Sequence, residues 1–268
     1  MQRMPRVLAS TTSHKKEPLL PTLEVFGRLG LVALDLNLHH LIEVGVPVET
    51  VERALAEQGQ RVWVVSGGWC DFFNGPPEIE RTVHSVARQV DLAQRLGASR
   101  LRLFFGRLKR SDYSPAVQDV ICDNLRRLSD HYLDMTFVFE NHDGASLDPA
   151  ICAEIFGRVD RPNVRMNFDP INFERAGVDS LAALDAVQPF VGHVHLKGLE
   201  AGEYCEFGTG DVDLRPVLER LLDAGYTGQF TVEYEGPFDG TLRLHQSVRR
   251  ADATLAAVEE RREERCHL

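Results

Sequence analysis

The chain has 268 residues, of which 43% are hydrophobic and 26% are charged, a composition typical of a globular protein. Its formal net charge of −10 opposes binding to phosphate backbones, so we expect no nucleic-acid partner. The sequence contains no run of 18 apolar residues, so we expect no membrane span. Its length suits one α/β barrel, which takes about 250 residues.

The cysteines and the N-terminus indicate a reducing compartment. There are 5 cysteines, an odd number, and no two of them form a CxxC pair, so neither a disulfide framework nor a zinc knuckle is expected. Residues 1–10 lack the apolar stretch and the cleavage site of a signal peptide. We therefore expect free thiols and a cytoplasmic location.

Short runs rich in β-branched and aromatic residues alternate with longer amphipathic stretches along the whole chain. Each run has the length of a strand and is bounded by Gly, Pro, Asp or Asn. The predicted strands are residues 6–10, 31–36, 61–66, 100–105, 136–140, 164–168, 191–196 and 229–234.

Helical spacing of apolar residues fills the gaps between these runs. The best case is 77–96, where Val83, Val86, Val90 and Ala93 recur on one face; further helices are predicted over 114–131, 213–225 and 242–264. Strand-helix alternation predicts a parallel sheet, and eight units favour a closed (β/α)₈ TIM barrel formed by residues 1–268 as one domain. An open doubly wound sheet is the alternative, but no GxGxxG motif follows the first strand.

Residues with metal-binding or acid-base side chains occupy the last four predicted strand ends. Glu140 ends the fifth strand, Asp169 follows the sixth, His195 lies near the end of the seventh and Glu233 near the end of the eighth. Active sites of such barrels lie at the C-terminal ends of the strands. The spacing therefore predicts that these four side chains converge.

Three carboxylates and one imidazole favour a single divalent metal ion, with Mn²⁺ or Mg²⁺ preferred and Co²⁺ or Zn²⁺ as alternatives. Taken singly, each residue has a simpler explanation. Glu140 could be a surface acid, Asp169 before Pro170 could start a turn, His195 could be a core histidine and Glu233 could pair with an arginine. Their joint placement at consecutive strand ends favours the metal site.

Five motifs, in this order and spacing, resemble the xylose-isomerase-like TIM barrel superfamily, which includes sugar phosphate isomerases and epimerases. They are FENHDG (139–144), NFDPIN (167–172), GHVHLK (192–197), GTGDVD (208–213) and VEYEG (232–236). By this resemblance Glu140, Asp169, His195 and Glu233 fall on the metal ligands of the family. The resemblance also implies that Glu140 and Glu233 are the catalytic acid-base pair.

The activity implied by the resemblance is that of a metal-dependent isomerase or epimerase. Its substrate would be a small sugar or polyhydroxy carbonyl compound, reacting through a metal-stabilised enediolate. The alternative is a metal-dependent dehydratase of the inosose or dehydroshikimate type. A non-catalytic binding barrel and a nuclease like endonuclease IV are less favoured, the latter because Gly67 and Gly68 follow the third strand where that nuclease needs histidine.

The pattern departs from free-sugar ketose 3-epimerases at two positions. Those enzymes carry an arginine six residues after the strand-seven ligand and a glutamate six residues after the strand-five ligand. Here the positions are Ala201 and Ser146. A common Lys-Asp pair after strand seven is Lys197-Gly198 here. The reaction and substrate are left open, as is homo-oligomerisation.

Other polar or aromatic residues near the strand ends are candidates for contact with substrate. His142, Asn172 and Lys197 follow strands five, six and seven, although Lys197 could instead extend into solvent. The remaining candidates are His193, which shares a strand face with His195, and Trp69 after strand three. His14 and His40 are expected in solvent or at the barrel mouth.

Overall fold

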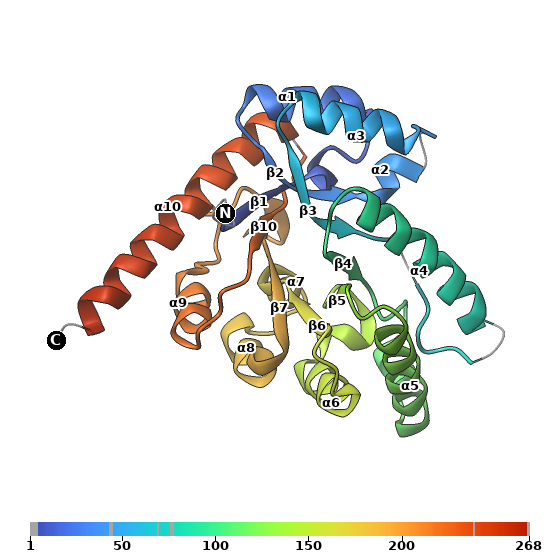
Figure 1. Ribbon diagram of the computed structural model, residues 1–268. Coiled ribbons are helices and arrows are strands. Elements are labelled where there is room, and N and C mark those ends of the chain that lie inside the picture. The colour runs from blue at the N-terminus through green and yellow to red at the C-terminus, as the bar shows by residue number, and fades with distance from the viewer. Residues whose placement is uncertain (1–4, 43–44, 69, 76–77, 238, 267–268) are drawn as a thin grey trace.

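The computed structural model describes residues 5–42, 45–68, 70–75, 78–237 and 239–266. Eight parallel strands close into a barrel in the order β1-β10-β7-β6-β5-β4-β3-β2, with helices around the outside (Figure 1). The predicted fold class, a (β/α)₈ TIM barrel, is therefore confirmed. The barrel strands are β1 Val7–Ser10, β2 Ala33–Asn37, β3 Arg61–Ser66, β4 Arg100–Leu103, β5 Thr136–Glu140, β6 Val164–Phe168, β7 Val191–Leu196 and β10 Phe230–Val232.

The last barrel strand closes the ring by pairing with the first. Val7 lies opposite Phe230 and Ala9 lies opposite Val232 in a parallel register, while β10 pairs with β7 on its other side. Strand interiors are apolar because helices cover the outside and side chains fill the inside, so both faces are buried. In β5, Phe137 and Val138 have no exposed surface.

Helices follow the strands and form the outer layer. They are α1 Leu19–Arg28, α2 Leu38–Ile42, α3 Val48–Glu57, α4 Glu78–Arg95, α5 Pro115–His131, α6 Pro149–Val159, α7 Pro170–Arg175, α8 Ser180–Val187, α9 Arg215–Asp223 and α10 Gly240–Cys266, with short 3₁₀ turns at Thr11–His14, Arg110–Asp112, Gly144–Leu147 and Gln188–Phe190. The Ser114 hydroxyl accepts a hydrogen bond from the Val117 amide and starts α5 one residue before Pro115.

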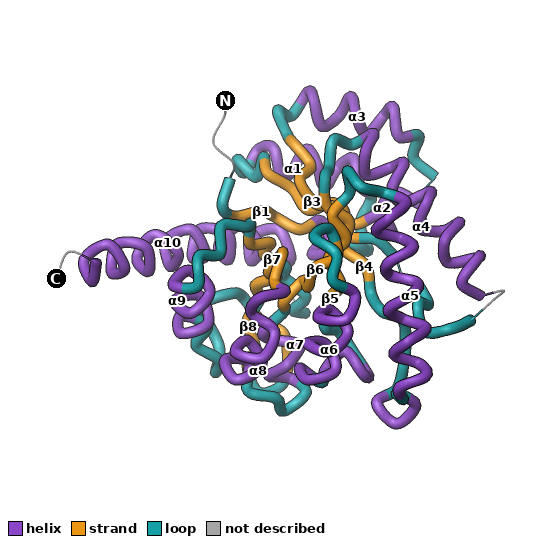
Figure 2. The backbone as a smooth tube through the Cα atoms, turned by 60° about the horizontal axis from the view of Figure 1, so that its bottom comes forward, coloured by secondary structure: helices purple, strands orange, loops and turns teal. Residues whose placement is uncertain are grey.

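Helix α4 differs in part from the sequence prediction, whereas α10 lies where the sequence predicts it. In α4 the apolar stripe is buried at Val86, Val90 and Ala93, but Val83 is 41% exposed because it lies at the border of that stripe. The long α10 extends beyond the barrel, as Figure 2 shows. It is tied to α9 by ion pairs such as Arg262–Asp223 at 2.8 Å. No helix among the described residues is long and apolar enough to cross a membrane.

A small antiparallel hairpin after β7 was not predicted. It joins β8 Gly198–Glu200 to β9 Glu203–Cys205, with Ala201 and Gly202 at positive φ in the turn. Three-residue strands carry too little hydrophobic periodicity to be recognised in the sequence. Gly198 is required here, because a Cβ at this position would lie 2.2 Å from the Glu206 carbonyl oxygen. Any larger residue here, aspartate included, would force the hairpin backbone to shift.

Candidate metal centre

The four predicted ligands converge at the C-terminal ends of the strands. One donor atom from each of Glu140, Asp169, His195 and Glu233 lies within 4.8 Å of the others. All four side chains are buried, with 3% or less of their surface exposed. Glu140 ends β5, His195 lies in β7, and Asp169 and Glu233 directly follow β6 and β10. The parallel strands thus bring together residues that are far apart in the sequence.

Asp169 is fixed by the start of the following helix. Its Oδ1 accepts hydrogen bonds from the backbone amides of Ile171 at 3.0 Å and Asn172 at 3.1 Å, which caps α7. The Asn141 side chain holds the Asp169 backbone by bonding both its amide and its carbonyl, each at 2.8 Å. With Oδ1 occupied in this way, Oδ2 is the oxygen that faces the cluster, where Lys197 Nζ lies 2.9 Å from it.

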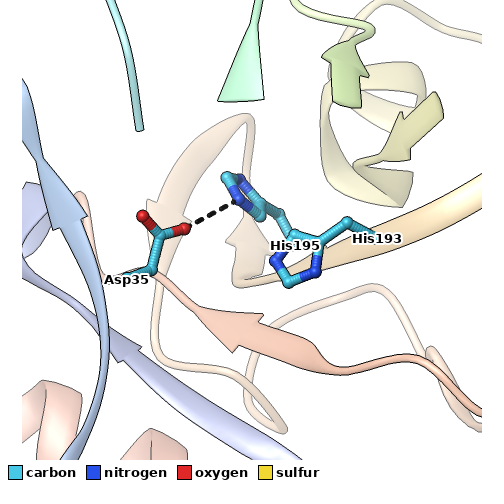
Figure 3. Close-up of side chains that lie close together, drawn as sticks. All are labelled: Asp35, His193 and His195. Atoms are coloured by element: carbon cyan, nitrogen blue, oxygen red, sulfur yellow. Dashed lines mark ion pairs between the residues drawn. The ribbon is translucent and has the colours of Figure 1, made fainter. Parts of the chain in front are cut away.

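The two ring nitrogens of His195 face different carboxylates. Nδ1 lies 3.4 Å from Glu233 Oε2 and 3.8 Å from Glu140 Oε2, whereas Nε2 lies 3.4 Å from Asp35 Oδ2. Figure 3 shows Asp35 and His195 pointing toward each other, with His193 beside them. The glutamates are thus on the Nδ1 side of the ring and Asp35 is on the Nε2 side.

Lys197 lies inside the cluster rather than in solvent. Its Nζ is 2.9 Å from Asp169 Oδ2, 2.9 Å from Glu235 Oε1 and 3.6 Å from Glu233 Oε2, and the side chain is 1% exposed. The alternative that Lys197 extends into solvent is therefore wrong. The charge of Lys197 is retained although it is buried, because carboxylates surround it. Burial lowers its pKa, but Asp169, Glu235 and Glu233 together raise that pKa well above its usual value.

The pKa values of the ligands reflect the same crowding of charges. Burial has the largest effect on the pKa of Asp169 and raises it. Lys197 lowers this pKa and Glu140 raises it, and the net shift is upward. For Glu233, burial acts to raise the pKa, but His195 and Lys197 outweigh it and hold the pKa well below its usual value. Burial lowers the pKa of His195, but the charges of Glu233 and Glu140 raise it well above 6.5. Closely spaced buried carboxylates require a positive charge among them.

The donor set fits a divalent cation. Three carboxylates and an imidazole are suitable ligands for Mg²⁺ or Mn²⁺. Within the described part of the chain, Asp169 Oδ2 faces Lys197 Nζ at 2.9 Å and His195 Nδ1 faces Glu233 Oε2 at 3.4 Å, so both atoms point into the cluster. Four buried donor atoms within 4.8 Å of one another, three of them on carboxylates, match the donor set of a cation site.

The other candidate residues lie at different depths. Asn172 is 4% exposed and donates to Glu140 Oε1 at 3.0 Å, so it contacts a predicted ligand directly. His193 is fully buried, bonds the Thr231 hydroxyl at 2.8 Å and packs edge-on against His195. His142 is exposed and packs against the Phe104 ring.

Three further predictions concern Trp69, His14 and His40. Trp69 lies outside the described residues. His14 and His40 are buried rather than in solvent, because Thr241 and the Glu17 carbonyl oxygen bond their rings. Their contacts place them beside the barrel mouth but do not join them to the four-residue cluster.

Several buried polar residues of the centre were missed by the sequence analysis. Arg102 of β4 forms an ion pair with Glu140 Oε2 at 3.2 Å, and Ser10 donates to Glu233 Oε1 at 3.3 Å. Asp35 of β2 faces His195, and Ser66 of β3 donates to Asp35 at 2.8 Å. A usable signal existed, because Asp35 and Arg102 are charged residues that each lie between two leucines of a predicted strand. Such charges in a parallel barrel need buried partners.

A model of the xylose isomerase-like TIM barrel family matches residues 32–255. The chain therefore belongs to that family. Among curated proteins, 3-dehydroshikimate dehydratase of Bacillus anthracis is 22% identical over 130 residues, which cover 47% of this chain and 46% of the relative. Inosose dehydratase of Geobacillus thermodenitrificans is 27% identical over 169 residues, covering 53% of this chain and 57% of the relative. The chain thus spans about half the length of the curated relatives it matches.

Solved structures match over nearly the whole chain. An L-ribulose 3-epimerase superimposes with a TM-score of 0.81 at 14% identity, covering 97% of each chain. A xylose isomerase-like TIM barrel protein from Mycobacterium smegmatis in complex with magnesium gives a TM-score of 0.75 at 18% identity, covering 94% of this chain and 97% of that one. At such identities these likenesses establish the shared fold.

Proposed function

We propose that this chain is a divalent-metal-dependent enzyme that moves a proton next to the carbonyl group of a small polyhydroxy compound. Glu140, Asp169, His195 and Glu233 are the proposed ligands of one ion, Mn²⁺ or Mg²⁺. The observation that carries the proposal is the convergence of four buried donor atoms within 4.8 Å of one another. Residues 1–268 are proposed to form one domain.

The cation and the protein side chains have different proposed roles in the reaction. The bound ion supplies a Lewis acid that withdraws electrons from the substrate carbonyl. Glu140 and Glu233 accept or donate the proton, and they approach the centre from strands that are separated by β6 and β7 in the barrel. Asn172 and Arg102 hold Glu140, and Ser10 holds Glu233, so each carboxylate has a fixed orientation.

Isomerisation or epimerisation is the leading reaction. In isomerisation one base carries the proton between neighbouring carbons, and in epimerisation two bases act on opposite faces. The structural likeness to L-ribulose 3-epimerase is compatible with either. Ala201 lies in the hairpin turn and cannot supply the arginine of free-sugar ketose 3-epimerases. We therefore propose a substrate other than a free ketohexose.

Dehydration is the second candidate, and the curated relatives favour it. Both are named as dehydratases, one of inosose and one of 3-dehydroshikimate. Dehydration begins with the same proton abstraction beside a carbonyl and differs in the loss of a hydroxyl at the next carbon. One set of ligands and one pair of glutamates can serve both reactions.

Proton exchange in D₂O separates these candidates. The Mg²⁺-loaded protein is incubated with ketoses, inososes, hydroxypyruvate and dehydroshikimate, and the products are followed by NMR. Deuterium next to a carbonyl without loss of water indicates an isomerase or epimerase, and an unsaturated product indicates a dehydratase. The chelator-treated protein and Glu140→Gln are the controls, and both are expected to be silent. Exchange that persists in both would contradict the proposal.

A further inference from the structure

Asp35 is a buried charge in the middle of an apolar strand. It lies in β2 between Leu34 and Leu36, and none of its surface is exposed. In the barrel order β1 and β10 separate β2 from β7, so Asp35 reaches His195 across the interior rather than from a neighbouring strand (Figure 3). Burying a carboxylate costs free energy unless it has polar partners, so we expect Asp35 to have a specific structural or functional role.

The geometry points to a positioning role for Asp35, which rests on the proposed metal site. We propose that Asp35 holds the His195 ring so that the Nε2 proton faces the carboxylate and Nδ1 faces the cation. Asp35 Oδ2 lies 3.4 Å from Nε2, and within the described residues neither atom has another hydrogen-bond partner. Metal-binding histidines commonly donate their second ring N–H to a carboxylate, which fixes both tautomer and orientation.

A chain of contacts links Asp35 to a second proposed ligand. The Ser66 hydroxyl donates to Asp35 Oδ1 at 2.8 Å. Arg102 Nε lies 3.3 Å from the same hydroxyl oxygen and 3.2 Å from Glu140 Oε2. Glu140 in turn lies 3.8 Å from His195 Nδ1, which closes a ring of five side chains. Three strands that carry no proposed ligand therefore support two ligands, His195 across the barrel interior and Glu140 on the neighbouring strand β5.

A second cation bound by Asp35, His193 and His195 is the competing explanation. One donor atom from each of the three lies within 4.8 Å of the others. This arrangement would use His195 Nε2, the atom that already faces Asp35, and Arg102 places a further positive charge beside Ser66. His193 already bonds Thr231 through Nε2. The positioning role accounts for the Asp35–His195 pair without a further ion.

The test compares Asp35→Asn with wild type by calorimetric titration of Mn²⁺ into the metal-free protein. Asn keeps the size of Asp and an oxygen for Ser66, but it removes the negative charge opposite His195. We expect affinity for one ion per chain to fall by about 10-fold to 100-fold, the usual cost of losing such a partner. Asp185→Asn, which breaks a surface pair with Arg220 on α9, is the matched control and should bind as wild type does.

Nitrogen-15 NMR of histidine-labelled, Mg²⁺-loaded wild type supplies a readout that needs no variant at Asp35. We expect His195 to carry its proton on Nε2, with Nδ1 at the cation. A proton on Nδ1 would overturn the proposal even if Asp35→Asn fails to fold. Unchanged affinity in a folded Asp35→Asn would also overturn it, as would two ions in wild type and one in the variant. If wild type binds no Mn²⁺, the proposed function itself falls and the positioning role falls with it.

Discussion

The two halves of the barrel contribute different parts of the buried centre. Strands β5, β6, β7 and β10 end in the four proposed ligands, whereas β2, β3 and β4 supply Asp35, Ser66 and Arg102. The first set converges on one point; Asp35 contacts it from across the interior, and Arg102 contacts it from the neighbouring strand. In this account one half of the barrel binds the ion and the other half orients the ligands. Changes in the two halves should therefore have different consequences.

The largest effect is expected from the glutamates of the ligand half. Glu140→Gln and Glu233→Gln should each lower kcat by about 10²-fold to 10⁴-fold, because each removes a group that transfers the proton. The check is steady-state kinetics on the substrate found by proton exchange. Glu219→Gln on α9, whose partner Arg261 is on the surface, serves as the control. Near-normal turnover in either variant would remove that glutamate from the acid-base role.

Replacement of Arg102 tests the supporting half of the barrel through its effect on the free energy of unfolding. Arg102→Met keeps the bulk of the side chain but leaves Glu140 with a buried charge and without its ion-pair partner. Breaking a buried pair in this way costs about 3–5 kcal/mol of unfolding free energy. Urea unfolding of the metal-free protein measures it. Addition of Mg²⁺ should recover part of the loss, because the ion also neutralises Glu140, and an equal loss with and without Mg²⁺ would contradict the shared centre.

His195→Ala removes one of the four proposed ligands and the side chain that Asp35 orients. Affinity for Mn²⁺ should fall by at least roughly 100-fold, more than for Asp35→Asn, because a donor atom is lost rather than misaligned. Calorimetric titration of both variants gives the ranking. The reverse ranking would mean that Asp35 binds the ion itself.

The sequence predicted the ligand half better than the supporting half. Glu140 and Asp169 stand where a predicted strand ends, so the barrel rule alone places them together. Asp35 lies inside a predicted strand and Ser66 ends one, but a single polar residue in a strand does not say which of the other strands it will face. That pairing depends on the diameter and stagger of the closed barrel, which the local sequence does not encode.

The hairpin and the buried histidines were also not predictable from the local sequence. The β8–β9 strands are three residues each, too short for a periodic signal. His14 and His40 were expected in solvent or at the barrel mouth because they follow the first two predicted strands. Tertiary contacts with Thr241 and Glu17 bury them instead.

A smaller effect is expected from pH, and it acts at these histidines. Burial lowers the pKa of both His14 and His40 below 6.5 in the folded chain. Because the pKa is lower in the folded chain, the unfolded chain binds more protons than the folded chain when the pH is below 6.5. The contribution of these histidines to the free energy of unfolding is therefore complete above pH 6.5 and is lost as the pH falls below it. Urea unfolding from pH 7.5 to 5.5 measures this decline, which the raised pKa of His195 opposes. His40→Gln should reduce its slope, and an unchanged slope would exclude His40 as a source.

The smallest effect is expected from breaking an ion pair on the outer surface of the barrel. The Arg220–Asp185 pair joins α9 to α8, and both side chains are about half exposed. Solvent screening leaves such pairs with little net contribution. Arg220→Ala should leave the Tm and the Mn²⁺ affinity unchanged within error. A clear loss of affinity would show that the surface layer, and not only the buried centre, controls the site.

The most direct test is a crystal structure of the protein grown with Mn²⁺ and measured at the manganese absorption edge. The account predicts one strong anomalous peak, about 2.0–2.4 Å from His195 Nδ1 and from an oxygen of each of Glu140, Asp169 and Glu233. Asp35 should lie on the far side of the ring, against Nε2. A peak between Asp35 and His193, or no peak at the four residues, would contradict it.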